Sequence, residues 1–260
     1  MTTALPELPV QYFQGRDGAG LAYRELGGGR PLILIHGYFS TAQVNWLRYG
    51  HAALLAEAGY RVIMPDLRSH GDSVKSHDAA SYGLDILADD ALALIEHLGL
   101  TDYDLGGYSL GGRTTMRALV RGAQPARAIV AGMGLDGIVK ATGRGGHFRR
   151  ILTNLGSFER GSAEWMAEAF LKTVGGDPIA LLHILDTFVD TPAAALQQVD
   201  LPVLIVAGID DQDNGSAADL AAALPQGHHV TIPGNHMSAV TLAALGTAMR
   251  DFLGDPSDLR

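Results

Sequence analysis

The sequence predicts an α/β protein with a mostly parallel sheet, and two observations support this fold class. Short segments rich in apolar residues lie at 31–35, 60–64 and 201–207, and such runs are typical of strands buried on both faces of a sheet. Helix-forming segments lie between them, as at 85–98, where apolar residues recur with a period of 3.6. Strands that alternate with helices predict βαβ units.

The composition excludes several other classes. The chain has 260 residues, 47% of them hydrophobic, which is enough for one large domain with a substantial core. Its net charge of −9 disfavours binding to nucleic acid or to an anionic membrane. The absence of cysteine excludes disulfides, a cysteine nucleophile and thiolate metal ligands.

The N-terminal residues and the hydropathy pattern indicate a cytoplasmic protein. Residues 1–9 lack a cationic region followed by an apolar one, so we expect no signal peptide. No apolar run approaches the ~20 residues that a membrane-spanning helix needs. We expect a small-molecule substrate and no nucleic-acid or membrane partner, and the sequence leaves a monomer and a homodimer open.

The first half of the chain begins with two strands, at 10–14 and 21–25, around a turn-rich stretch suited to a hairpin. Parallel units follow, because each further strand is separated from the next by a helix. The remaining strands of this half are expected at 31–35, 60–64, 103–105 and 128–131, and the helices at 49–58, 85–98 and 113–120.

The stretch from 132 to 199 holds no convincing strand and is too long for an ordinary crossover. Helices are expected at 146–155, 162–174 and 177–190, with Ser162 as an N-cap and Pro178 in a first turn. We therefore predict a core made of 1–132 and 200–260 and a helical cap at 133–199, inserted after the sixth strand.

The sheet resumes after this insertion. Strands are expected at 201–207 and 228–232, and helices at 217–224 and 239–252. In such sheets ligands bind beyond the carboxyl ends of the strands. The residues expected to carry chemistry should therefore lie in the loops that leave those ends.

The motif Gly107-x-Ser109-x-Gly111 lies between a strand and a helix and has the form of a nucleophile elbow. A strand that turns directly into a helix crowds the backbone, so the residues two before and two after the serine must be small. Such a motif also occurs by chance, so other parts of the chain must show whether this one is a nucleophile elbow.

Two further features make the motif more specific. Acidic residues follow the strand at 201–207, and His236 follows the last strand, in the chain order Ser…Asp…His that accompanies a nucleophile elbow. A serine hydroxyl is a weak nucleophile, so it needs a base to take its proton and a carboxylate to orient that base.

These residues together resemble the α/β-hydrolase superfamily over nearly the whole chain, least in the cap. Its matching motifs are His36-Gly37-Tyr38, Asp66-x-Arg68-x-His70-Gly71-x-Ser73, the elbow at 107–111, Gly208-x-x-Asp211 and Pro233-Gly234-Asn235-His236. Two positions depart from the pattern: Ser69 and Asn235 both stand where glycine is usual.

The resemblance implies an α/β-hydrolase fold, a twisted sheet flanked by helices, and roles for particular residues. Ser109 would be the nucleophile, His236 the general base and Asp211 the orienting acid. The backbone N–H groups of Tyr38 and Leu110 would form the oxyanion hole. Asp210 and Asp213 are alternatives for the acid. Asp136 is a lesser alternative, because some members of the superfamily carry the acid after the preceding strand.

The cap is rich in large apolar side chains, most of which we expect to pack within the cap itself. We expect a pocket for an acyl or aromatic substrate of modest size. Its predicted lining residues are Phe39, Tyr108, Phe148, Trp165 and Met237.

No cofactor and no metal site are expected. The ten histidines include no pair at helical ligand spacing. The stretch from Asp211 only faintly resembles a calcium loop, because its sixth position is not glycine and its twelfth is Ala222. Asp66, Arg68 and His70 are expected to hold a loop together by hydrogen bonds. Arg113 is expected to be an anchor on the helix face, and an anionic substrate would instead make it a substrate clamp.

The primary hypothesis is a serine hydrolase that cleaves an ester, thioester or lactone through an acyl-enzyme. An aspartate at the elbow would have suggested a dehalogenase or an epoxide hydrolase, and Ser109 argues against both. The alternatives are a cofactor-free oxygenase, a C–C hydrolase or a lyase that uses the same residues, and a non-catalytic small-molecule receptor on this fold.

Overall fold

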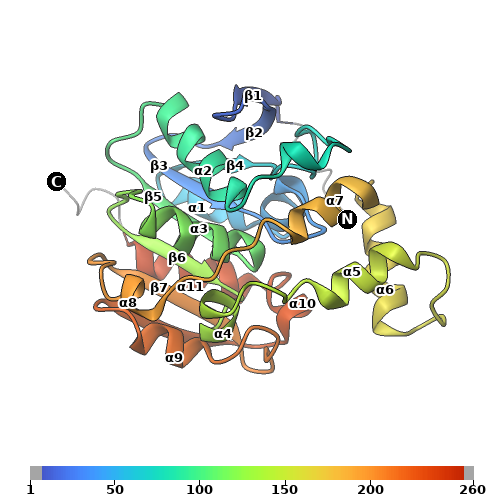
Figure 1. The fold of residues 1–260 in the computed structure, drawn as a ribbon. Helices are drawn as coiled ribbons and strands as arrows, with labels where there is room; N and C mark the ends of the chain where they lie inside the picture. The colour runs from blue at the N-terminus through green and yellow to red at the C-terminus, as the bar shows by residue number, and fades with distance from the viewer. Residues whose placement is uncertain (1–7, 255–260) are drawn as a thin grey trace, which may run out of the picture.

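A computed structural model describes residues 8–254 of the chain (Figure 1). Its centre is an eight-stranded sheet in the order β1-β2-β4-β3-β5-β6-β7-β8. The strands are β1 (Gln11–Gln14), β2 (Gly20–Leu26), β3 (Arg30–Ile35), β4 (Tyr60–Pro65), β5 (Asp104–Tyr108), β6 (Ala128–Ala131), β7 (Val203–Gly208) and β8 (Gly227–Ile232).

The sheet is parallel except at one edge. β1 pairs antiparallel with β2, and β2 pairs antiparallel with β4, as expected for the predicted hairpin. All other neighbours are parallel, from β3 and β4 to β7 and β8. The carboxyl ends of the six parallel strands therefore lie on one edge, and the loops that leave these ends meet there.

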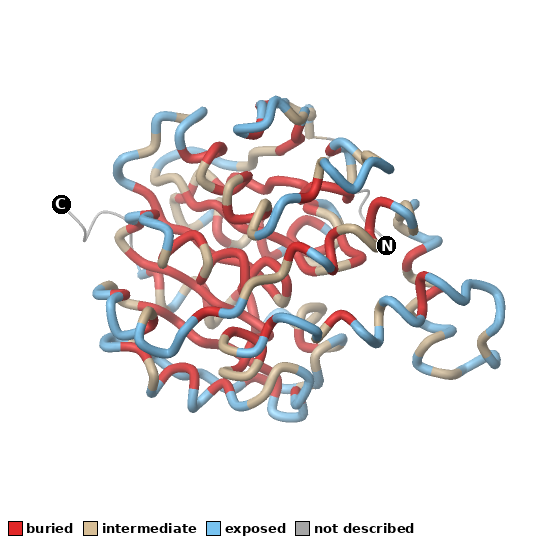
Figure 2. The backbone as a smooth tube through the Cα atoms, in the orientation of Figure 1, coloured by how far each residue is buried: buried red, intermediate tan, exposed pale blue. Residues whose placement is uncertain are grey.

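Helices cover both faces of the sheet, and its central strands are buried (Figure 2). Successive residues of these strands therefore pack on opposite faces. In β3, Leu32 and Leu34 pack toward α1 and α11, whereas Ile33 and Ile35 pack toward α2 and α3. This explains the continuous apolar run of β3. The helices of the core are α1 (His51–Glu57), α2 (Ile86–His97), α3 (Leu110–Val120), α9 (Ala217–Ala222), α10 (His236–Ala239) and α11 (Ala243–Leu253).

Between β6 and β7 the chain forms only helices over residues 132–202, all of which the structure describes. They are α4 (Leu135–Val139), α5 (Gly146–Thr153), α6 (Ala163–Thr173), α7 (Pro178–Leu185) and α8 (Ala193–Leu196). The exact limits of a cap domain at 133 and 199 stay a prediction.

Some elements differ from the sequence prediction. The helix predicted at 177–190 ends at Leu185, because residues 187–189 leave the helix and Asp85 donates its backbone N–H to the Thr187 carbonyl. The helix predicted at 239–252 is two helices, since Asn235 caps a separate turn that starts at His236. The short helices α4 and α8, a π-helical turn at Gln43–Leu47 and a 3₁₀ turn at Ala79–Ser81 were not predicted.

The cap has an inner and an outer part. The inner helix α7 is bonded to the core: the Tyr38 hydroxyl donates to the Leu181 carbonyl at 2.7 Å, and the Ser69 hydroxyl donates to that of Ala180 at 3.2 Å. Helices α5 and α6 and the segment that connects them project from the body of the molecule (Figure 1). We call residues 146–173 the α5–α6 lobe.

Ser69, one of the two departures from the family pattern, lies in a backbone conformation that favours glycine. Its φ is 69°, and its side chain is fully buried. Its hydroxyl also lies 2.8 Å from that of Tyr82. Because the Tyr82 proton goes to the Ser76 carbonyl, the single Ser69 proton can serve only one of its two neighbours at a time. That hydrogen bond offsets the cost, about 1 kcal/mol, of a non-glycine residue at positive φ.

Within residues 8–254, none of the helices is long and apolar enough to cross a lipid bilayer.

Candidate active site

Ser109 lies at the sharp turn from β5 into α3. Its φ is 54° and its ψ is −115°, a strained conformation for a residue with a side chain. A Cβ atom on Gly107 would lie 2.3 Å from the carbonyl carbon of Gly111, and one on Gly111 would lie 2.0 Å from the Ile35 carbonyl oxygen. The turn is therefore possible only with glycine at both positions, and it presents Ser109 at the carboxyl edge of the sheet.

His236 joins Ser109 to Asp211. Its Nε2 lies 2.9 Å from the Ser109 Oγ, and its Nδ1 lies 2.9 Å from Oδ2 of Asp211. Because a carboxylate can only accept, Nδ1 carries the proton and Nε2 is free to accept the serine proton. The three residues come from the ends of β5, β7 and β8, which are brought together by the parallel sheet.

The structure separates Asp211 from the other acids considered at this position. Its carboxylate is buried, and its Oδ1 accepts from the backbone N–H of Asp213 at 3.2 Å. Asp210 is exposed, and Asp136 pairs with Lys140 at 3.0 Å, one helical turn away. Among these acids only Asp211 is hydrogen-bonded to His236 within the part of the chain that the structure describes.

Two further groups hold the histidine. The Tyr108 hydroxyl, one residue before the serine, donates to the His236 carbonyl at 2.6 Å. Asn235 caps α10: its side chain accepts from the backbone N–H groups of Met237 and Ser238, and Ser238 Oγ accepts from that of Asn235. Asn235 therefore replaces the usual glycine with a residue that fixes the turn next to His236.

The loop after β3 lies directly against the nucleophile. A Cβ atom on Gly37 would be 3.3 Å from the Ser109 Cβ. Asn45 Oδ1 accepts from the Gly37 N–H at 3.0 Å, and the ring of His36 accepts the Leu67 N–H at 3.0 Å. Within residues 8–254, the backbone N–H groups of Tyr38 and Leu110 donate to no protein acceptor, so both are available to an oxyanion.

The loop with Asp66, Arg68 and His70 is held as the sequence predicts. Arg68 is buried and pairs with Asp90 at 2.8 Å and with Asp17 at 2.7 Å. Asp66 accepts from the backbone N–H of Ala42 at 2.8 Å, close to the loop after β3 that carries Tyr38. His70 donates from Nδ1 to the Arg68 carbonyl, and burial, followed by the charge of His36, lowers the pKa of His70 to about 3.

Comparison with known proteins supports the fold that positions these residues. Residues 30–141 match the family model described as alpha/beta hydrolase fold. They include the loop after β3 and the turn at Ser109. A hydrolase from Pseudomonas aeruginosa PA01 shares the fold, with a TM-score of 0.76 and 23% sequence identity over 96% of this chain and all of that one. Residues 30–141 therefore resemble this family in sequence, and the whole chain has the α/β-hydrolase fold.

The proteins that match this chain in sequence carry the names of different activities. Over 124 residues, 45% of this chain, it is 40% identical to the dihydrolipoyllysine-residue acetyltransferase component of an acetoin cleaving system from Pseudomonas putida. Over 128 residues, 47% of this chain, it is 35% identical to a non-heme haloperoxidase from Rhodococcus erythropolis. The matches span 31% and 44% of these proteins, so the chain covers less than half of the length of either relative.

The five residues predicted to line the substrate pocket lie in different parts of the structure. Phe39 and Phe148 pack together and against Tyr38, with ring centroids 4.7 to 5.1 Å apart. Tyr108 is 4% exposed and belongs to the core, so it supports His236 and offers little surface to a ligand. Met237 is largely exposed beside His236, whereas Trp165 is on the α5–α6 lobe near Arg160.

One group of potential metal ligands overlaps the triad. Single ligand atoms of Asp211, Asp213 and His236 lie within 4.8 Å of one another. Asp211 and His236 already bond each other there, so a cation would have to break the triad. The same residues therefore cannot hold a cation and keep the His236–Asp211 hydrogen bond at the same time.

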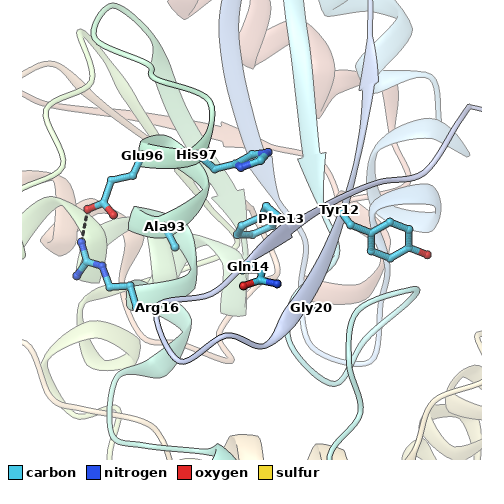
Figure 3. A pocket seen from close by; sticks show the side chains of 8 residues that line it. All are labelled: Tyr12, Phe13, Gln14, Arg16, Gly20, Ala93, Glu96 and His97. Carbon is cyan, nitrogen blue, oxygen red and sulfur yellow. Dashed lines mark hydrogen bonds and ion pairs between the residues drawn. The ribbon is translucent and has the colours of Figure 1, made fainter.

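One sizeable cavity lies away from the triad (Figure 3). Its volume is about 590 Å³, and it is bordered by β1, the turn that follows and α2. Phe13 and His97 face each other across it, while Arg16 pairs with Glu96 at its rim (Figure 3). None of its lining residues is one of the predicted site residues.

Sequence reasoning missed three supporting contacts. Asn45 in the π-helical turn holds Gly37, and the Tyr108 hydroxyl holds His236, and neither has a recognisable local signal. The capping role of Asn235 did have one, because an Asn followed three residues later by a Ser is a capping pattern.

Proposed function

We propose that the chain is a serine hydrolase that cleaves a carboxylic ester, thioester or lactone of modest size and largely apolar character. The observation that carries this proposal is the continuous hydrogen-bonded row Ser109–His236–Asp211, with both links at 2.9 Å. Serine, base and orienting acid in this geometry are what acyl transfer requires.

The chemistry follows from these contacts. Ser109 Oγ attacks the carbonyl carbon, and its proton passes to His236 Nε2, while Asp211 stabilises the resulting imidazolium. The backbone N–H groups of Tyr38 and Leu110 stabilise the negative charge that develops on the carbonyl oxygen; one such donor contributes on the order of 3 kcal/mol. His236 then protonates the leaving group, and water, activated by the same imidazole, hydrolyses the acyl-enzyme.

The first test is the intact mass of the protein after reaction with a fluorophosphonate. We expect one adduct on the wild type and none on Ser109→Ala, which should keep the fold because a hydroxyl is replaced by hydrogen. Hydrolysis of p-nitrophenyl esters should follow the same pattern. A folded wild type that forms no adduct and hydrolyses no ester would refute the proposal.

A second candidate comes from the relative named as a non-heme haloperoxidase. An acyl-enzyme can react with hydrogen peroxide in place of water, which gives a peroxy acid and free Ser109 with atoms balanced. Peroxide-dependent bromination that requires both a carboxylic acid and Ser109 would support this activity. Its absence beside ester cleavage would leave the hydrolase alone.

A further inference from the structure

The turn after β3 contains a strained residue, as the elbow does. In residues 37–40 the Ser40 N–H donates to the Gly37 carbonyl at 3.2 Å, which closes the turn. Phe39, inside this turn, has a φ of 60°, in the left-handed region that favours glycine. A bulky side chain adopts this conformation only where the surrounding structure holds it there. Whatever holds the turn therefore also fixes the direction of the Tyr38 N–H, the predicted oxyanion donor.

The core and the cap hold different parts of this turn. Gly37 is held by the core, because the Asn45 side chain accepts its N–H at 3.0 Å. Phe39 is 2% exposed and packs within the apolar cluster of the cap. The other buried members of this cluster lie in α5, α6 and α7: Ile151, Leu152, Leu171, Leu181 and Leu185. Burial among these side chains keeps Phe39 in its strained conformation.

Tyr38 is joined to the cap by both its hydroxyl and its ring. The hydroxyl donates to the Leu181 carbonyl of α7 at 2.7 Å. The ring centroid lies 4.8 Å from that of Phe148 in α5 and 4.7 Å from that of Phe39. Because the N–H and the side chain belong to one residue, a shift of α7 against the core would displace both. The predicted oxyanion donor is thus mechanically linked to the cap.

The second predicted donor is fixed in a different way. Leu110 is the first residue of α3, and its carbonyl accepts from the Thr114 hydroxyl at 2.8 Å, one helical turn further on. Its N–H therefore keeps the direction of α3, which follows directly from the elbow. A shift of the cap would move the Tyr38 N–H relative to the Leu110 N–H, and a developing oxyanion needs both donors within hydrogen-bond distance.

We propose that Tyr38 and Phe39 are positioning residues through which the cap holds the Tyr38 N–H in the oxyanion hole. The cap helices then contribute to the rate of the chemical step, although none of α4 to α8 carries a member of the triad. This proposal rests on the serine hydrolase activity proposed above and adds a control of the same site by the cap.

Tyr38→Phe tests the link to α7, because it keeps the ring and removes the hydrogen bond to Leu181. Since the loss of a whole donor lowers kcat by about 10²- to 10³-fold, a displaced donor should lower it less, roughly 10-fold. The KM for p-nitrophenyl acetate should change by less than about 2-fold, because acylation and deacylation use the same donors and slow together. An unchanged kcat would contradict the proposal.

Inhibition by phenylboronic acid distinguishes a displaced donor from a loss of folded enzyme. This compound forms a tetrahedral adduct with a serine hydroxyl, and one of its oxygens takes the place of the oxyanion. Its inhibition constant should rise in Tyr38→Phe by the same factor as kcat falls. Partial unfolding would lower kcat and leave the inhibition constant unchanged, and that result would overturn the proposal.

Tyr60→Phe is the matched control for this substitution. The Tyr60 hydroxyl also donates to a backbone carbonyl, that of Leu253 at 3.1 Å. Tyr60 is the first residue of β4, so it lies at the opposite edge of the sheet from the candidate site. We expect Tyr60→Phe to keep the wild-type kcat and inhibition constant. Equal changes in Tyr38→Phe and Tyr60→Phe would refute a specific role of Tyr38.

Hydrogen exchange separates this proposal from the hydrolase proposal, because it needs no catalysis. In the Ser109→Ala protein, Leu181→Ala should loosen the cap cluster and make the hydrogen-bonded amides of Gly37 and Ser40 exchange several-fold faster. Leu220→Ala is the matched control, since it makes the same change at a fully buried leucine of α9, in a cluster that excludes the turn. It should leave the exchange of both amides unchanged.

The two proposals fail on different results. Faster exchange in Leu181→Ala than in Leu220→Ala, with no ester cleavage by the wild type, would refute only the hydrolase. Ester cleavage by the wild type, with equal exchange in the two leucine variants and equal kcat in the two tyrosine variants, would refute only the control by the cap.

Discussion

The edge of the sheet that carries Ser109 and the α5–α6 lobe above it are built in opposite ways. At the edge, glycines are required because backbone atoms leave no room for a Cβ. His236 is held there by hydrogen bonds from its ring to Asp211 and from the Tyr108 hydroxyl to its carbonyl. In the lobe, Gly156 and Gly161 have open space around them, and Trp165 and Met166 are exposed. Figure 2 shows the same contrast, with buried backbone in the core and exposed backbone in the lobe.

This difference indicates how the two parts can serve one reaction. The chemistry needs atoms held within a few tenths of an ångström, which the packed sheet edge provides. The lobe contacts the rest through α7 and through Phe148, which packs on Tyr38 and Phe39, and the exposed side chains of its outer part take no share in these contacts. Four paired substitutions test whether the contrast holds in solution.

The largest effect should come from the acid of the triad. Asp211→Asn should lower kcat about 10⁴-fold, because an amide that donates to His236 favours the wrong tautomer of the imidazole. Asp213→Asn is the matched control, since only the backbone N–H of Asp213 contacts Asp211. Ester hydrolysis by both purified variants measures the difference. Equal losses, or a larger loss for Asp213→Asn, would reassign the acid.

The next largest effect should come from glycine-to-alanine changes. Gly107→Ala should lower the free energy of unfolding by about 3 kcal/mol or more, because its Cβ would lie 2.3 Å from a backbone carbon. Gly161→Ala in the lobe meets no atoms, and its φ of +90° should cost only about 1 kcal/mol. Urea denaturation compares them, and similar losses would show that the two regions are packed alike.

A third comparison uses pH. Since the pKa of His70 is about 3 in the folded protein and ordinarily about 6.5, the unfolded chain binds the extra proton between these values. The free energy of unfolding should therefore fall as pH decreases below 6.5, and His70→Phe should remove about 2 kcal/mol of the loss between pH 7 and pH 5.

The control for the pH experiment is His147→Phe, at an exposed histidine of the lobe. Urea denaturation at pH 7, 6 and 5 gives the slope for each protein. If His70→Phe and His147→Phe changed the slope equally, the neutral buried state of His70 would be disproved.

The smallest effect should come from two helix caps. Asn235→Ala and Ser162→Ala each remove a side chain that accepts backbone N–H groups, and each should cost about 1 kcal/mol of stability. Only Asn235→Ala should also lower kcat, because the turn it caps carries His236. Thermal unfolding and ester hydrolysis separate these effects. An activity loss in Ser162→Ala as large as in Asn235→Ala would mean that the lobe is coupled to the triad.

The sequence by itself was sufficient to predict the order of strands and helices in the core and which loops meet at the candidate site. Buried parallel strands read as apolar runs because both faces are covered, and Gly107 and Gly111 are dictated by a backbone that admits no side chain there. Because parallel strands end on the same edge, Ser109, Asp211 and His236 could be placed together without coordinates.

Tertiary structure alone decided what depends on contacts between distant segments. The choice among Asp210, Asp211, Asp213 and Asp136 rests on which carboxylate reaches His236, since all four follow the carboxyl end of a strand. The helix predicted at 177–190 ends early because Thr187 bonds to Asp85, more than 100 residues earlier in the chain. The pairing of Arg68 with Asp17 and Asp90 is likewise visible only in three dimensions, because a sequence shows which charges exist but not which of them meet.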